Sequence, residues 1–157
     1  MTSITWVGLT PQQLAHLADA ETLIGPPMSR ALAKAGLVVE SDAKRNAPVD
    51  TGRLRASITN RVDTAPLAKY VEIGTNVSYA RWVHNGRRPG SMPPARALFT
   101  WSRRHGNINP FVLARVIQQR GIRPRPFLTE GLIKNVSRIV GFFRTAGKEI
   151  EQAWGSR

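Results

Sequence analysis

A proline-bounded corner near the middle of the chain constrains the fold more than any other feature. Pro48 disfavours the helical conformation at Ala47, so a helix arriving from the N-terminal side should end near Asn46. Asp50 can accept hydrogen bonds from backbone groups two residues further on, and Gly52 tolerates positive φ. We therefore expect a compact turn here, between a helical pattern and a strand pattern.

Helical periodicity precedes the corner and returns at the end of the chain. Apolar residues recur at three- and four-residue steps over 27–46 and again over 127–153, and the second helix should be about 40 Å long. Gly25, Pro26 and Pro27 should break or kink the helix that comes before them, because an interior proline removes a hydrogen bond and clashes with the preceding turn. The two long helices should pack together, and the remaining apolar side of the terminal helix is expected to face another subunit.

Between the long helices, apolar and polar residues alternate in short runs. The alternation predicts strands at 54–62, 68–73 and 77–84, and a weaker alternation at 2–7 suggests an edge strand. The connections between these runs are short, so neighbouring strands should be antiparallel.

A helical hairpin is expected as an insertion at about 92–121. Its first helix opens at Pro93–Pro94. Its second is bracketed by Asn109 as the cap, Pro110 in the first turn and Gly121 as the stop. Such an insertion fits a DNA-facing or partner-facing arm and fits a satellite core equally well.

These elements predict an α+β fold in one domain over residues 1–157: a small antiparallel sheet of three or four strands, packed by two long helices, with the inserted hairpin. A chain of 157 residues with a hydrophobic fraction of 41% and a charged fraction of 21% can bury an ordinary globular core. We expect no membrane span, because no apolar run reaches about 18 residues. The N-terminus lacks the features of a secretory signal, and the absence of Cys excludes disulfides and thiolate metal sites.

Positive charge dominates the chain. There are 23 Lys and Arg residues against 10 Asp and Glu residues, a net charge of +13. No acidic residue occurs from Ile73 to Thr129, whereas arginines are frequent there, so some of them are expected to face outward. This surface is either simply a soluble basic face or a binding face for a polyanion or an acidic partner protein.

The sequence has no recognisable catalytic or metal-binding pattern. His16, His84 and His105 lack the spacing of a metal site, and neither a nucleophile elbow nor a phosphate-binding or dinucleotide-binding loop is present. Asp50 and Glu72 are the one conceivable carboxylate pair, as in a glycosidase, but a turn-forming residue and an ordinary strand residue argue against it. We expect no enzymatic activity, no cofactor and no metal.

Three motifs, in this order, resemble one family. A long amphipathic helix leads into Ala47-Pro48-Val49-Asp50-Thr51-Gly52-Arg53-Leu54-Arg55-Ala56-Ser57-Ile58. Next come Tyr70-Val71-Glu72-Ile73-Gly74-Thr75 and Tyr79-Ala80-Arg81-Trp82-Val83-His84-Asn85-Gly86, and then Arg125-Pro126-Phe127-Leu128. From about residue 14 to residue 150, the chain is similar to the gene-product-ten-like tail-component family of lambdoid siphophages, whose members join heads to tails.

The resemblance implies a structural virion protein that forms a ring at the head–tail junction and supports tail attachment and DNA passage. It would act as a neck, tail completion or tail terminator protein. Its partners would be further copies of itself, joined during assembly, and neighbouring head-completion and tail-tube proteins, with transient DNA contact and no membrane. It would pass through the host cytoplasm during assembly and end in the virion.

Two sets of residues are the candidates for these contacts. Subunit or partner contacts are expected from Arg53, Arg55, Glu72, Tyr79, Trp82, Phe127 and Phe143. Contacts with DNA or an acidic neighbour are expected from Arg87, Arg88, Arg103, Arg104, Arg115 and Arg120. The acidic neighbour is slightly preferred, because a conducting channel should not bind DNA tightly.

Two other functions stay open at this level. The first is a free-standing basic nucleic-acid-binding protein, although Phe99 and Trp101 have the spacing of helix-face core residues rather than of a base-stacking platform. Trp82 is likewise expected in the core or on the face of the sheet, and His84 as a half-buried residue at the end of a strand. The second is a toxin or cell-wall enzyme that depends on the two carboxylates named above.

Overall fold

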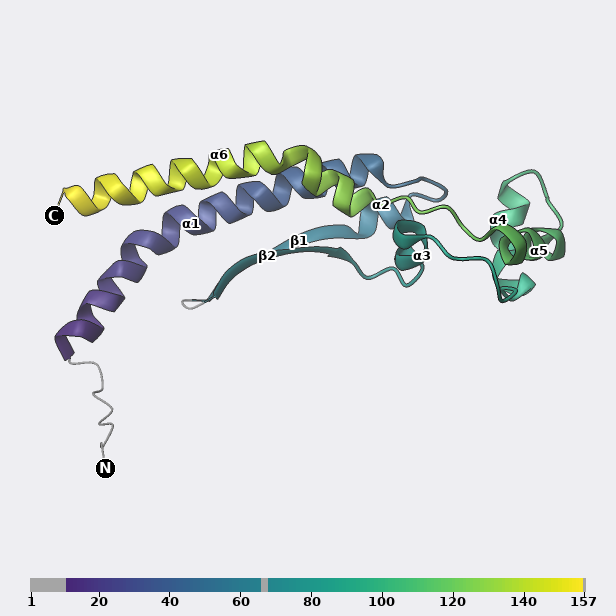
Figure 1. The fold of residues 1–157 in the computed structure, drawn as a ribbon, viewed down its shortest axis with the longest axis horizontal. Coiled ribbons are helices and arrows are strands. Elements are labelled where there is room, and N and C mark those ends of the chain that lie inside the picture. Colours follow the sequence, from purple (N-terminus) through teal and green to yellow (C-terminus); the bar gives the residue numbers. More distant parts are fainter. Residues whose placement is uncertain (1–10, 66–67, 157) are drawn as a thin grey trace, which may run out of the picture.

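The computed structural model describes residues 11–65 and 68–156, so the suggested edge strand at 2–7 lies outside it. The fold is α+β, made mostly of helices with a two-stranded antiparallel sheet. In chain order the elements are α1 (Pro11–Asn46), α2 (Arg53–Ser57), β1 (Ile58–Ala65), β2 (Ala68–Thr75), α3 (Ala80–Asn85), the 3-10 helix η1 (Ala95–Leu98), α4 (Phe99–Arg104), α5 (Pro110–Arg120) and α6 (Phe127–Gly155). Figure 1 shows an elongated molecule in which α1 and α6 lie side by side, the β-hairpin runs along α1, and α4 and α5 form one end.

The long helix α1 ends where the corner predicts, but it is not broken by its prolines. It ends at Asn46, two residues before Pro48, and Gly52 adopts the expected positive φ of 79°. Of the predicted break or kink at Pro26 and Pro27, the break does not occur, because α1 continues through both prolines. Figure 1 shows α1 curving towards its N-terminal end, and bending is the usual way in which a helix accommodates an interior proline.

The sheet has two strands rather than three or four. The strand expected at 54–62 is a helical turn, α2, followed by β1, and the segment expected as a third strand at 77–84 contains the helix α3. Leu54 and Ile58 are both buried and lie four residues apart, so their spacing fits a helical turn as well as an alternating strand. The strand predicted at 68–73 is confirmed and extends to Thr75.

Helix α1 packs against one face of the β-hairpin. The side chain of Glu40 accepts a hydrogen bond of 2.9 Å from the backbone N–H of Asn60 on β1 and a second from the Asn60 side-chain amide. Further along the same face, Lys69 of β2 forms an ion pair of 2.5 Å with Glu21. The hairpin is thereby anchored to α1 at two points.

Helix α6 packs against α1, as predicted for the two long helices, and begins at Phe127 as expected. The two helices approach closely at Gly131, where an added Cβ atom would lie 3.0 Å from the backbone nitrogen of Ala43. One turn later, the buried side chain of Asn135 donates a hydrogen bond to the buried carboxylate of Asp42.

The core lies where the end of α1, the corner, the start of β1 and the start of α6 meet. Its buried members are Ala43, Ala47, Leu54, Ile58, Val77, Ala80 and Phe127. Phe127 is fully buried there, so the expectation that it contacts another subunit is wrong for this structure.

The inserted hairpin is present between α3 and α6. The side chain of Asn109 accepts a hydrogen bond of 2.9 Å from the backbone N–H of Phe111, Pro110 begins α5, and Gly121 ends it with φ of 72°, all as predicted. The first helix of the hairpin is divided into η1 and α4. Backbone hydrogen bonds of 2.9 and 2.8 Å, exchanged between Arg87 and Ile122, join the outgoing and returning chains. We call these paired segments, 86–90 and 121–125, the neck.

Candidate functional site

A cleft lies between the corner and the inserted hairpin. It has a volume of about 880 Å³ and is walled by the corner, α3, α4, α5 and the returning segment of the neck. We call it the corner cleft. Its apolar lining comes from elements that are distant in sequence and includes Tyr79, Val83, Leu98, Leu113, Ile117 and Ile122.

An ion pair bridges the corner cleft from the corner to α4. The guanidinium of Arg104 donates hydrogen bonds to both carboxylate oxygens of Asp50, one of them 2.9 Å from Nε. His105 lies 3.8 Å from the same carboxylate and stacks on Trp101 with ring centroids 4.1 Å apart. The hydrogen bond from Arg104 holds the pKa of Asp50 below its ordinary value.

This pairing corrects one expectation about Asp50. We predicted that its side chain would bond to the backbone of the turn, but it is bound to Arg104 instead. The conceivable carboxylate pair with Glu72 is not formed, because Glu72 is an exposed β2 residue paired in register with Arg61 on β1, whereas Asp50 lines the corner cleft.

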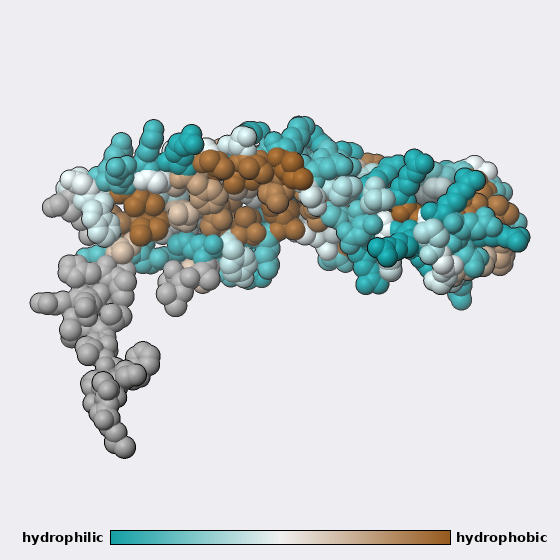
Figure 2. Space-filling model, in the orientation of Figure 1, coloured by the Kyte–Doolittle hydropathy of each residue, from teal (hydrophilic) through white to brown (hydrophobic). Residues whose placement is uncertain are grey.

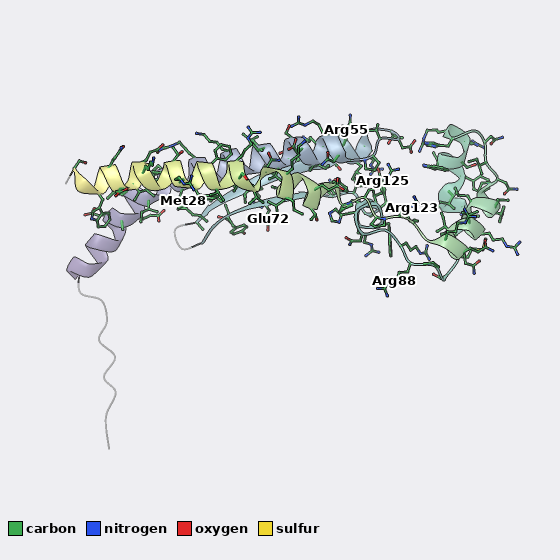
Figure 3. All side chains as sticks on the ribbon, turned by 45° about the horizontal axis from the view of Figure 1, so that its top comes forward. Met28, Arg55, Glu72, Arg88, Arg123 and Arg125 are labelled. Carbon is green, nitrogen blue, oxygen red and sulfur yellow. The ribbon has the colours of Figure 1, made fainter. Side chains whose placement is uncertain are left out.

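Positive charge surrounds the corner cleft. Its lining includes four arginines: Arg53, Arg104, Arg123 and Arg125. In the part of the chain that the structure describes, Asp50 is the one acidic residue that lines it. Figure 3 shows Arg123 and Arg125 near each other between the long helices and the insertion, with Arg55 above and Arg88 below them in this view, whereas Glu72 lies away from them on the hairpin. From the sequence, Arg123 and Arg125 count among the basic residues but are not among the candidate contact residues. The Arg-Pro-Arg-Pro segment that returns from the insertion is the sequence signal that could have identified them.

Trp82 lies on the surface rather than in the core. Its side chain on α3 is 45% exposed, and the guanidinium carbon of Arg81 lies 4.6 Å from its ring centroid. Arg87 approaches the same ring at 6.0 Å and also donates a hydrogen bond of 2.7 Å to the carbonyl of Ser91. An exposed indole flanked by two cations is a cation–π cluster that can take part in recognition.

His84 is half-buried, but on α3 rather than at the end of a strand. Its ring packs edge-on against Phe127, with centroids 5.3 Å apart, and its Nε2 lies 3.2 Å from the hydroxyl of Thr129. Within residues 11–65 and 68–156, no group of three or more metal-ligating side chains is placed to hold a metal ion. In the same ranges, no helix has the length and hydropathy needed to cross a bilayer.

One face of α6 exposes an apolar stripe. Leu132, Ile133, Val136 and Val140 recur at helical spacing, and Ile133 is 67% exposed while the other three are nearly half exposed. We call these four residues the α6 stripe. Figure 2 shows a broad apolar area over the paired α1 and α6 helices. Exposed apolar areas of this kind commonly mark protein–protein contacts.

The remaining candidate residues are dispersed. Arg53 and Tyr79 meet Arg104 at the corner cleft. Arg55 is exposed on α2, Phe143 is half-buried on α6, and Arg88 is exposed in the neck. The other selected arginines of the insertion are exposed and do not line the cleft: Arg103, Arg115 and Arg120. Phe99 and Trp101, expected as helix-face core, are 44% and 37% exposed.

Comparison with known families gives a match over the first part of the chain. Residues 14–86, which run from α1 through α3, match the family HK97-gp10_like, described as "Bacteriophage HK97-gp10, putative tail-component". The resemblance seen in the sequence is thereby confirmed for this stretch, and the family is one of phage tail components. Searches of curated proteins and of solved structures gave no match.

Proposed function

We propose that this protein is a structural virion component that forms a ring at the phage head–tail junction. In this role it acts as a neck, tail completion or tail terminator protein, supports tail attachment and leaves a passage for DNA. The family match over residues 14–86 supports the tail-component part of the proposal. The ring rests on the surface of α6, and its position at the junction rests on the sequence resemblance.

The α6 stripe is the observation that carries the proposal. Its four residues do not contribute to the buried core of the chain, yet they keep a continuous apolar row on one side of a 29-residue helix. A branched aliphatic side chain gains about 1.5 to 3 kcal/mol when it passes from water into a packed interface. Burial against a neighbouring copy therefore gives the stripe a reason to be apolar.

A ring requires each copy to present two different surfaces to its neighbours. The α6 stripe would be one of them, and the outer face of the β-hairpin with Glu72, together with the exposed Arg55 of α2, would supply polar contacts on the other. The basic insertion would then meet a neighbouring head-completion or tail-tube protein, or contact DNA transiently during passage. The match of residues 14–86 to a family of putative tail components also supports a role without enzymatic activity.

Native mass spectrometry combined with electron microscopy of the purified full-length protein tests the ring directly. We expect a closed ring of one stoichiometry near physiological salt, either with the protein alone or after addition of the neighbouring tail proteins. Particles that remain monomeric in both samples would contradict the proposal.

A basic nucleic-acid-binding protein is the second candidate, and the Trp82 cluster favours it. An exposed aromatic ring between Arg81 and Arg87 resembles the stacking and charge contacts that proteins use on single strands. Titration with single-stranded and duplex DNA over a range of salt concentrations separates the two functions. Tight binding at physiological salt, with a steep salt dependence, would favour this candidate over the ring.

A further inference from the structure

We propose that the corner cleft binds an acidic peptide segment with apolar anchor residues, contributed by a neighbouring tail protein. This inference rests on the proposed function and gives one of its contacts a chemical identity.

The floor of the corner cleft suits apolar side chains. Leu98, Leu113 and Ile117 come from the insertion, Val83 comes from α3, and Ile122 lies in the neck. Ile122 is 38% exposed, so the floor is accessible from outside. A cavity of about 880 Å³ falls within the range of typical ligand sites and has room for a few side chains of a peptide.

The rim determines the charge of the partner. Arg53, Arg123 and Arg125 are exposed, and no ion pair engages them among the described residues. Asp50, the one carboxylate among the described residues that line the cleft, is already bound by Arg104. A segment with carboxylates would therefore find unpaired guanidinium groups around an apolar floor, and guanidinium groups bind carboxylates well.

The walls of the cleft are held in position before any partner arrives. The Asp50–Arg104 ion pair connects the corner to α4, and the backbone N–H of Arg125 donates a hydrogen bond of 2.8 Å to the carbonyl of Val83. A preformed site loses less conformational entropy on binding than a flexible one.

A peptide fits this cleft better than a nucleic acid does. Phosphates could use the arginines, but they would leave the aliphatic floor uncovered. Trp101, one of the aromatic rings that line the cleft, is already stacked on His105 with an interplanar angle of 10°. The exposed indole of Trp82 is not among the residues that line the cleft.

Fluorescence anisotropy with three labelled peptides of equal length tests the proposal. One peptide alternates Glu with Leu, the second alternates Glu with Ser, and the third alternates Lys with Leu. We expect the Glu–Leu peptide to bind at least about tenfold more tightly than either of the others, because it alone satisfies both the rim and the floor. Equal affinity for the Glu–Ser peptide would overturn the proposal, since the floor would then contribute nothing.

A matched pair of variants locates the binding. Arg123→Glu with Arg125→Glu reverses two charges on the rim and should weaken binding of the Glu–Leu peptide by about tenfold or more. Arg144→Glu with Lys148→Glu reverses two exposed charges on α6 outside the cleft and should change it by less than about threefold. An equal loss in both variants would show that only the net charge of the protein matters. Displacement of the labelled peptide by duplex DNA at a lower concentration than by unlabelled Glu–Leu peptide would identify the site as a nucleic-acid site. Both outcomes would refute the proposal.

These measurements do not depend on the ring. If the protein stays monomeric but binds the Glu–Leu peptide in the cleft, the ring is contradicted and the binding site is supported. If the protein forms rings but shows no preference among the three peptides, the ring is supported and the binding site is contradicted.

Discussion

Asp42 of α1 accepts a hydrogen bond from the side-chain amide of Asn135 of α6, and the two residues are only 4% and 2% exposed. The pair lies in the contact between the two long helices. Asn135 also donates a hydrogen bond of 2.8 Å to the carbonyl of Gly131, so its amide links the buried carboxylate to the backbone of α6. A buried polar pair of this kind favours one relative register of two helices, because a shift along either helix breaks the hydrogen bond between them.

Replacing Asn135 by Ala should lower stability in a way that depends on pH. The hydrogen bond from Asn135 is the main cause that lowers the pKa of Asp42, and the charge of Arg45 lowers it further. The unfolded chain therefore binds the proton more readily than the native one. The contribution of the Asp42 carboxylate to the free energy of unfolding is therefore fully present above its ordinary pKa of 3.8. It is lost as the pH falls from there through the lowered pKa of the native state.

The urea midpoint of Asn135→Ala should accordingly lie further below that of the wild type near pH 6 than near pH 3. Gln152→Ala, which removes an exposed amide from the same helix, serves as the control and should change stability by no more than about 0.5 kcal/mol at either pH. A difference for Asn135→Ala that is the same at both pH values would show that Asp42 is not the group involved.

Two glycines of α6 should respond in opposite directions to the same substitution. A Cβ atom at Gly131 would lie 3.0 and 3.2 Å from backbone atoms of α1, whereas nothing lies within 4 Å of one at Gly147. We expect Gly131→Ala to destabilise by about 1 to 3 kcal/mol through overpacking. Gly147→Ala should stabilise by about 0.5 to 1 kcal/mol, because alanine favours a helix. Guanidinium denaturation measures both, and a stabilising Gly131→Ala would contradict the close approach of α1 and α6.

The neck should depend on glycine at position 121. Gly121 has φ of 72°, and an added Cβ atom would lie only 2.1 Å from the carbonyl oxygen of Arg87. Gly106 also has positive φ, 84°, but has open space around it. Gly106→Ala should therefore cost only the backbone strain, about 1 kcal/mol, while Gly121→Ala should cost more and open the neck.

Limited proteolysis and thermal unfolding measure this difference. We expect faster cleavage between residues 86 and 125 in Gly121→Ala than in Gly106→Ala. Equal behaviour of the two variants would mean that the backbone pairing of Arg87 with Ile122 does not hold the insertion in place.

Local signals predicted several elements well. Pro48 ended α1 at Asn46, and the Asn109, Pro110 and Gly121 signals bracketed α5 correctly, because caps and prolines act on the backbone within a few residues. The terminal helix was found because its apolar periodicity extends over many turns.

The errors arose where a short window fits two periods. Leu54, Ala56 and Ile58 alternate, but Leu54 and Ile58 are also one helical turn apart, and the chain forms a turn of helix before the strand begins. Residues 77–84 are expected as a strand, but Ala80 and Val83 are three residues apart, a step that fits the observed helix α3. Only packing against the core decides between the two periods.

The candidate site was predicted only in part. The basic character of the insertion follows from composition, but the partner of Arg104 is 54 residues away in sequence and could not be identified without the fold. The corner cleft likewise brings together residues from the corner, α3, the insertion and the neck. The α6 stripe, in contrast, was anticipated from the surplus of apolar residues on the terminal helix.

The central claim is that copies of the protein assemble through the α6 stripe. Sedimentation velocity of a variant with charges placed on the stripe, over a range of protein concentrations, tests this claim most directly. Ile133→Glu with Val140→Glu places two charges on the stripe, and Thr145→Glu with Gln152→Glu adds the same charges at exposed positions of α6 outside it. We predict that the wild type and the Thr145 and Gln152 variant form the same closed oligomer, while the stripe variant remains a folded monomer. An oligomer that persists in the stripe variant would contradict the role of α6 in assembly, and a monomeric wild type in the presence of its neighbouring tail proteins would contradict the ring itself.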